Sequence, residues 1–211
     1  MFAISFFDPD HGTAVGDWGT ILMTDNGGKF WQKYRLNEDV ILYGVARLSV
    51  ETACAVGEMG RIFITRNKGG SWQEVDSPVA STLFCLCHEK KLLCAAGLDG
   101  AAVYSRDMGL TWNQGQTPVK ESIYGISICG TRVLAVGNSG TLMGSENGGA
   151  QWERFTTANA LPFWLGTISW ARSGANAFSG IIAGANGRHI CLNNNTIHWP
   201  KRLVGCGKEA P

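Results

Sequence analysis

The sequence predicts an all-β protein, a β-propeller of five four-stranded blades. Five segments share a G-x-x-G turn followed by a tryptophan, and the first glycine precedes that tryptophan by 15 residues in every case. Successive first glycines are 41, 40, 40 and 47 residues apart, and about 40 residues is the length of one propeller blade. Segments between the turns alternate or run apolar for four to six residues, as strands do, without a 3.6-residue helical period.

Each repeat is predicted to contain four strands. The first opens on an aromatic residue, in turn Phe2, Tyr43, Phe84, Tyr124 and Trp164. The second is short and apolar, and G-x-x-G joins it to the third as a two-residue hairpin in which glycine relieves positive-φ strain at the flanks. The tryptophan begins the fourth strand and is expected to pack between neighbouring repeats. The single domain therefore divides into blades at about 1–38, 39–79, 80–119, 120–160 and 161–205.

A second turn, between the third and fourth strands, carries the pattern S/T-x-D/N-x-G-x-x-W. We expect its Asn or Asp to accept backbone N–H groups and its glycine to be left-handed, so that the motif is structural. Its fullest form runs from Ser105 to Trp112, and the fifth repeat keeps only Trp199. The other positions are Thr24, Asn26, Gly28, Trp31, Thr65, Asn67, Gly69, Trp72, Asp107, Gly109, Ser145, Asn147, Gly149 and Trp152.

This pattern is the Asp box, or BNR repeat, which also occurs in sialidases and sortilin-type receptors. With the opening segment 7–12 and the A-V-G-x-x-G turns, nearly the whole chain resembles the photosystem II assembly and stability factors. That resemblance implies a seven-bladed propeller that binds partner proteins. Five repeats are fewer than seven, so a five-bladed ring, a fragment and a half that completes itself by dimerisation all remain open.

Composition excludes several classes of protein. Hydrophobic residues make up 45% and charged residues 17%, which is typical of a globular chain. The net charge of +1 predicts no nucleic-acid partner, and no segment is apolar and long enough to span a membrane. No leader is visible, so the sequence as given predicts a cytoplasmic protein, and a removed leader would make it extracytoplasmic. Of the seven cysteines, Cys54 and Cys94 take small apolar core positions and are expected to be reduced.

The sequence indicates no enzyme. The inner strands read FAISF, LYGVA, LFCLC, IYGIS and FWLGT, without the paired carboxylates that most glycoside hydrolysis requires. We therefore predict no catalytic residue. His189, Cys191 and His198 lack convincing metal-ligand spacing and a fourth ligand, so no metal and no cofactor are expected either.

Loop charges favour a protein-binding scaffold. Loops that join strands 1 to 2 and 3 to 4 share one face, and we define the basic arc on it as Arg47, Arg66, Lys68, Lys90, Lys91, Arg106 and Arg132. The opposite face carries Asp17, Glu58 and Asp99. The arc predicts a protein partner with an acidic segment.

Two alternatives stay open beside that prediction. The five aromatic residues form either packing between blades or a stacking platform for sugar, the latter typical of a carbohydrate-binding, sialidase-like module. An unclosed ring leaves two exposed edges, which favour pairing with a second copy as a homodimer.

Overall fold

The protein is an all-β propeller, as the repeats predicted. A computed structural model describes residues 1–157, 163–172, 178–193, 197–198 and 202–203. Within these ranges, five antiparallel sheets follow one another along the chain, each built from consecutive strands. No helix among the described residues is long and apolar enough to cross a membrane.

The first four sheets have four strands each. The first contains β1 (Ala3–Phe6), β2 (Gly12–Val15), β3 (Thr20–Thr24) and β4 (Gln32–Arg35). The second contains β5 (Leu42–Arg47), β6 (Ala53–Gly57), β7 (Ile62–Thr65) and β8 (Gln73–Val75). The third contains β9 (Leu83–Glu89), β10 (Leu92–Gly97), β11 (Ala102–Ser105) and β12 (Asn113–Gln114). The fourth contains β13 (Ile123–Cys129), β14 (Arg132–Gly137), β15 (Leu142–Ser145) and β16 (Glu153–Arg154).

The fifth sheet has three described strands, β18 (Leu165–Arg172), β19 (Phe178–Gly184) and β20 (His189–Asn193). The fourth strand that we expected at Trp199 lies outside the described residues. Two short strands, β21 (Ile197–His198) and β22 (Arg202–Leu203), pair with each other, and β22 runs parallel to β17 (Thr156–Thr157). The described end of the chain thus pairs back toward the fourth sheet.

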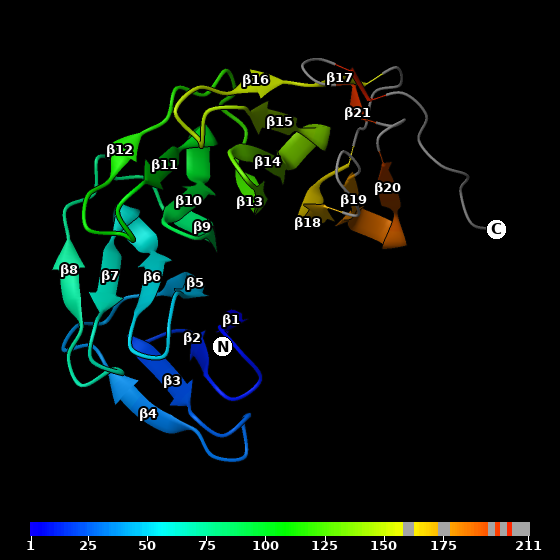
Figure 1. Ribbon diagram of the computed structural model, residues 1–211. Helices are drawn as coiled ribbons and strands as arrows, with labels where there is room; N and C mark the ends of the chain where they lie inside the picture. Colours follow the sequence, from blue (N-terminus) through cyan, green and yellow to red (C-terminus); the bar gives the residue numbers. More distant parts are fainter. Residues whose placement is uncertain (158–162, 173–177, 194–196, 199–201, 204–211) are drawn as a thin grey trace.

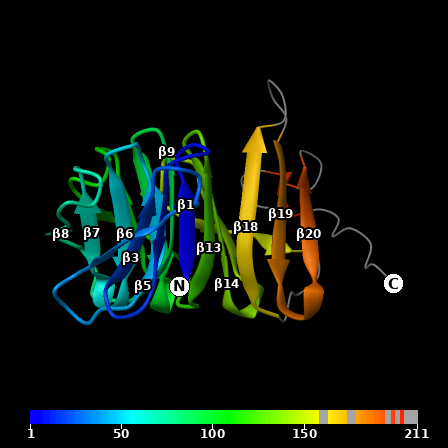
Figure 2. The ribbon, with the colours of Figure 1, turned by 90° about the horizontal axis from the view of Figure 1, so that it is seen from below.

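The sheets stand side by side in an open arc, with the first strand of each nearest the centre and β4, β8, β12 and β16 on the outside (Figure 1). Seen at right angles, the strands run between two opposite faces of the arc (Figure 2). Inner strands pack in chain order, from β1 against β5 to β13 against β18. The first and fifth sheets stand apart at the two ends of the arc (Figure 1).

Each junction between neighbouring sheets is an apolar core. Val15, Ile21 and Met23 of the first sheet pack with Val45 and Phe63 of the second. Similar clusters fill the next three junctions. Because both faces of an internal sheet are covered, strands such as β6 and β10 are buried almost throughout. Burial also raises the pKa of the free Cys54 and Cys94 thiols to about 12, in keeping with reduced core cysteines.

The tryptophans that begin the fourth strands occupy these junctions. Trp112 and Trp152 are buried in the cores before the third and fourth sheets. Trp72 packs partly against the first core, and Trp31, with no sheet before it, is half-buried. The expected packing between repeats is confirmed for Trp72, Trp112 and Trp152, while Trp199 lies outside the described residues.

The Asp boxes form the predicted turns. In all four, the Ser or Thr hydroxyl accepts the N–H of the box glycine at 2.8–3.0 Å. The Asn or Asp oxygen accepts the N–H of the residue before the tryptophan at 2.9–3.0 Å. The box glycines have φ values between +81° and +90°, the left-handed region that glycine enters without strain.

The G-x-x-G turns differ from our expectation. Positive φ falls on the third residue and the last glycine of the turn, not on the first glycine, and Trp18 and Met59 both sit at φ +54°. In the last four turns the first glycine is extended, and glycine is required because a Cβ would lie 1.9–2.4 Å from a backbone carbonyl oxygen. A Cβ on Gly97 would lie 1.9 Å from the carbonyl oxygen of Thr82, which accepts the N–H of Leu98. The turn thereby holds the linker that enters the inner strand.

Candidate functional site

The loops of one face are tied together by hydrogen bonds. In each of the first four blades, a backbone N–H of the Asp box donates to a carbonyl of the hairpin between the first two strands. The four pairs are Gly27 with Asp10, Lys68 with Glu51, Met108 with Lys91, and Gly148 with Thr131. The two loop sets therefore share one face, and this face carries the basic arc.

A cleft of about 490 Å³ opens on this face between the third and fourth blades. Its walls include Lys90, Lys91, Arg106, Glu89, Glu146 and Asn147. The first three belong to the basic arc, two from the hairpin after β9 and one from the third Asp box. The sequence placed them in one arc, and the structure brings them to one cleft.

The cationic groups of the cleft are held at its rim. Arg106 donates to the carbonyl of Asn147 at 2.8 Å, and its guanidinium carbon lies 5.0 Å from the ring centre of Tyr104. Lys90 has φ +55° at the hairpin tip and is exposed, as is Lys91. The Glu89 carboxylate accepts the N–H of Gly130 at 2.7 Å and so bridges the two blades. An acidic group entering the cleft would meet three cations and only one further carboxylate, Glu146.

Three other members of the basic arc, Arg66, Lys68 and Arg132, do not line this cleft. Arg66 is exposed and reaches the carbonyl of Met108, 3.5 Å away, in the next Asp box. Lys68 is exposed in the second box, and its carbonyl accepts the hydroxyl of Tyr34. Arg132 is half-buried at the start of β14.

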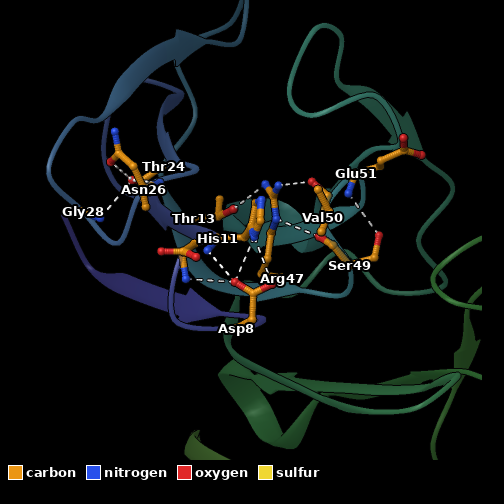
Figure 3. A network of polar contacts seen from close by, with 11 residues as sticks. Asp8, His11, Thr13, Thr24, Asn26, Gly28, Arg47, Ser49, Val50 and Glu51 are labelled. Atoms are coloured by element: carbon orange, nitrogen blue, oxygen red, sulfur yellow. Dashed lines mark hydrogen bonds and ion pairs between the residues drawn. The ribbon is translucent and has the colours of Figure 1, made fainter.

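Arg47 does not belong to an exposed arc. Only 2% of it is exposed, and its guanidinium is inserted between the first two blades (Figure 3). It donates to Thr13 Oγ1 at 3.1 Å and to the carbonyls of Ser49 and Val50. Burial lowers the pKa of this arginine, which the nearby Asp8 carboxylate partly offsets. Sequence placed Arg47 at a loop because β5 was expected to end before it, whereas the strand includes it.

A second feature is an arc of aromatic rings along the inner wall. Neighbouring ring centres are 5.4–6.3 Å apart from Phe2 through Tyr43, Phe84 and Tyr124 to Trp164. We call these five residues the aromatic ladder. Phe2 is 57% and Trp164 50% exposed, while the three between them are half-buried. Both expected roles, packing between blades and a surface for stacking, are compatible with this geometry.

Trp164 enters the ladder from an unexpected position. Tyr43, Phe84 and Tyr124 each occupy a β-bulge at the start of the inner strand, where the pairing with the second strand skips one residue. In the fifth sheet that step holds Gly166, and the ring of Trp164 lies over it, only 2.1 Å from where a Cβ would stand. The aromatic residues are therefore evenly spaced in the sequence, but Trp164 lies two residues before the bulge position that Tyr43, Phe84 and Tyr124 occupy in their sheets.

The inner strands are longer than predicted at their far ends. They include Arg47 and Glu89, although the predicted segments contained no charged residue. The Glu89 carboxylate accepts a hydrogen bond from the N–H of Gly130. The described inner strands contain no second carboxylate. Nor do the described residues contain a cluster of three metal-ligating side chains. His189 and Cys191 are exposed on β20, and the side chain of His198 lies outside the described residues.

Comparisons with known proteins establish the fold alone. No known protein family and no curated protein matches the sequence. Among solved structures, YCF48 bound to a D1 peptide is 19% identical with a TM-score of 0.68, covering 92% of this chain and 63% of that chain. An ancestral GH74 enzyme is 15% identical with a TM-score of 0.69, covering 97% of this chain and 32% of that chain. The WD40 repeats of RRP9 are 11% identical, with a TM-score of 0.68 and coverage of 96% and 66%. This chain thus spans less than two thirds of each structure's length.

Proposed function

We propose that this chain is a non-catalytic protein-interaction scaffold related to the photosystem II assembly factors, and that it binds an acidic segment of its partner. The observation that carries the proposal is the cleft between the third and fourth blades, where Lys90, Lys91 and Arg106 converge. One similar propeller, YCF48, is recorded with a bound peptide. Charge on the rim of such a cleft speeds encounter and selects acidic partners.

The geometry favours a short extended segment over a compact ligand. The cleft is open on one side and is bounded by the hairpins and Asp boxes of two blades. Arg106 keeps donors beyond the one bound to Asn147, and an arginine fork matches a carboxylate. Arg66 lies one blade further along the same face, where it extends the positive surface.

The test uses a fluorescein-labelled peptide of alternating Glu and Gly, followed by fluorescence anisotropy. Replacing Arg66, Lys91 and Arg106 together with Glu is expected to weaken binding by about tenfold or more, because carboxylates would face carboxylates. A single reversal, Lys91→Glu, is compared with Lys33→Glu as its matched control, since Lys33 is exposed on the outer strand β4 and both substitutions change the net charge by the same amount. Unchanged binding in the triple variant would overturn the proposal.

The aromatic ladder supports a second candidate, a carbohydrate-binding module. Exposed Phe2 and Trp164 offer faces for sugar stacking, and GH74 enzymes share the fold. A glycan screen discriminates the two functions. Sugar binding that Trp164→Ala abolishes, with peptide binding absent, would favour this module over the scaffold.

A further inference from the structure

The face opposite the basic arc contains a second cleft, of about 410 Å³, which the proposed function does not use. It lies in the second blade, between the G-x-x-G turn before β7 and the linker that runs from β8 to β9. Met59 and Gly60 line it on the turn side, and Val75, Pro78 and Val79 line it on the linker side. Because the second sheet has a sheet on either side, this cleft does not owe its exposure to either end of the chain.

Met59 is an unusual residue for the place that it occupies. It is the third residue of its turn and has φ +54°, and the equivalent residues are Trp18, Asp99, Ser139 and Asn186. Asn and Asp enter this left-handed region more readily than larger side chains do. The methionine side chain is 63% exposed, so burial in a core does not compensate for the strain. A residue that departs from the local preference without such a gain favours a role in binding.

The charges around the cleft are predominantly negative. Among the described residues that line it, Arg61 is the one cation, and it donates to Glu74 at 2.7 and 2.8 Å and to Glu38 at 2.6 Å. Asp76 also lines the cleft, is exposed and forms no ion pair within the described part of the chain. Glu58 is half-buried in the same turn. Four carboxylates therefore surround one guanidinium, and a cation is the charge that this surface attracts.

The first blade extends this surface. Trp18 holds the same turn position as Met59, with the same φ of +54° and an exposed fraction of 57%. Glu38 connects the two turns. Its carbonyl oxygen lies 2.7 Å from where a Cβ on Gly19 would stand, and its carboxylate binds Arg61. The residue at this turn position is exposed in all five blades, so the place of Trp18 in the first blade is not the cause of its exposure.

We propose that this cleft binds a basic, partly apolar segment of a partner protein, which gives the propeller a second binding site on the face opposite the basic arc. An apolar side chain of the segment packs on Met59, Val75 and Pro78, and a neighbouring Lys or Arg pairs with Asp76 and Glu74. Charge complementarity selects a basic segment, and the exposed apolar atoms select one that also carries apolar side chains. The proposal does not depend on the cleft between the third and fourth blades, since that cleft lies on the other face.

The test is fluorescence anisotropy with a fluorescein-labelled peptide of the repeat Gly-Lys-Gly-Leu. Met59→Asn is expected to weaken binding by about tenfold, because it removes the apolar contact. Asparagine tolerates φ +54° and stands at the equivalent position in the fifth turn, so this variant is expected to unfold at the same or a higher urea concentration than the wild type. Ser139→Asn, at the same turn position in the fourth blade, is the matched control and is expected to bind like the wild type.

A second pair of variants tests the charge. Asp76→Asn is expected to weaken binding severalfold, because it removes an exposed carboxylate from the cleft. Asp25→Asn removes an exposed carboxylate from the other face and is expected to leave the affinity unchanged. A peptide of Gly and Lys alone is expected to bind more weakly than the Gly-Lys-Gly-Leu peptide, because it offers no apolar side chain to Met59.

Three results would overturn the proposal. The first is a wild type that does not bind the Gly-Lys-Gly-Leu peptide, and the second is a folded Met59→Asn variant that binds it with unchanged affinity. The third is equal affinity for the peptide of Gly and Lys alone, since charge would then account for all of the binding. The Glu–Gly peptide, measured separately, is expected to bind Met59→Asn as tightly as the wild type, so the two proposed sites can fail independently.

Discussion

Asp107 shows how a single residue stabilises a turn. Partial desolvation raises the pKa of this carboxyl, but hydrogen bonds from Thr111, Ser105 and Leu110 outweigh it and lower the value to about 2. The three other boxes place a neutral Asn at the same position and make the same backbone contact. The third box therefore contributes to the stability of the fold in a way that is lost in acid, which the three Asn boxes do not.

The sign of this contribution follows from the lowered pKa. The ionised carboxylate stabilises the fold above the ordinary value of 3.8, and its contribution is lost as pH falls toward 2. Asp107→Asn is expected to lower the free energy of unfolding at pH 7 and to lose this difference near pH 2, as measured by urea unfolding at both values. Asp25→Asn, at an exposed position of the first box, is the control. A difference for Asp107→Asn that persists undiminished at low pH would contradict the assignment.

At the scale of the element, Gly97 and Gly187 show two separate reasons why a G-x-x-G turn requires glycine. Gly97 has an extended φ of −172° but leaves no room for a Cβ beside the Thr82 carbonyl. Gly187 has φ +71° with nothing within 4 Å of a Cβ. Space is therefore the constraint at Gly97 and backbone conformation the constraint at Gly187. Gly60 and Gly100 meet both constraints, since they have positive φ and a Cβ on either would lie 2.0–2.1 Å from a carbonyl oxygen.

Substitution by alanine separates these two constraints. Gly97→Ala is expected to cost about 3 kcal/mol, because a backbone carbonyl has to move. Gly187→Ala is expected to cost about 1 kcal/mol, the strain of a left-handed alanine. Urea unfolding of both variants measures the difference. Equal costs would contradict the close approach of the linker as the reason for glycine at position 97.

For the whole molecule, binding through the basic surface is expected to depend on salt. Raising the ionic strength from about 50 to about 500 mM shortens the screening length well below 10 Å, so binding of the Glu–Gly peptide is expected to weaken severalfold. Fluorescence anisotropy at several salt concentrations measures this change. Affinity that stays constant over the whole range would contradict an electrostatic contact.

The sequence by itself determined the fold class, the five repeats and the Asp-box turns. These features depend on contacts between residues close together in the sequence. In the Asp box, a Ser or Thr hydroxyl binds the N–H of the glycine four residues later, and the Asn or Asp between them binds the N–H of the residue four positions after itself. Strand length and residue spacing were less reliable guides. Trp164 kept the spacing of the ladder while the register of β18 moved by two residues.

Only the tertiary structure decided which side chains are available to a partner. Arg47 and Arg106 are both arginines near loops of one face, yet one is enclosed between blades and the other lines a cleft. Likewise Ile181 and Leu134 hold the same place in their repeats, but one is exposed and the other buried. The physical reason is that burial depends on whether a neighbouring sheet, contributed by residues about 40 positions away, covers that place.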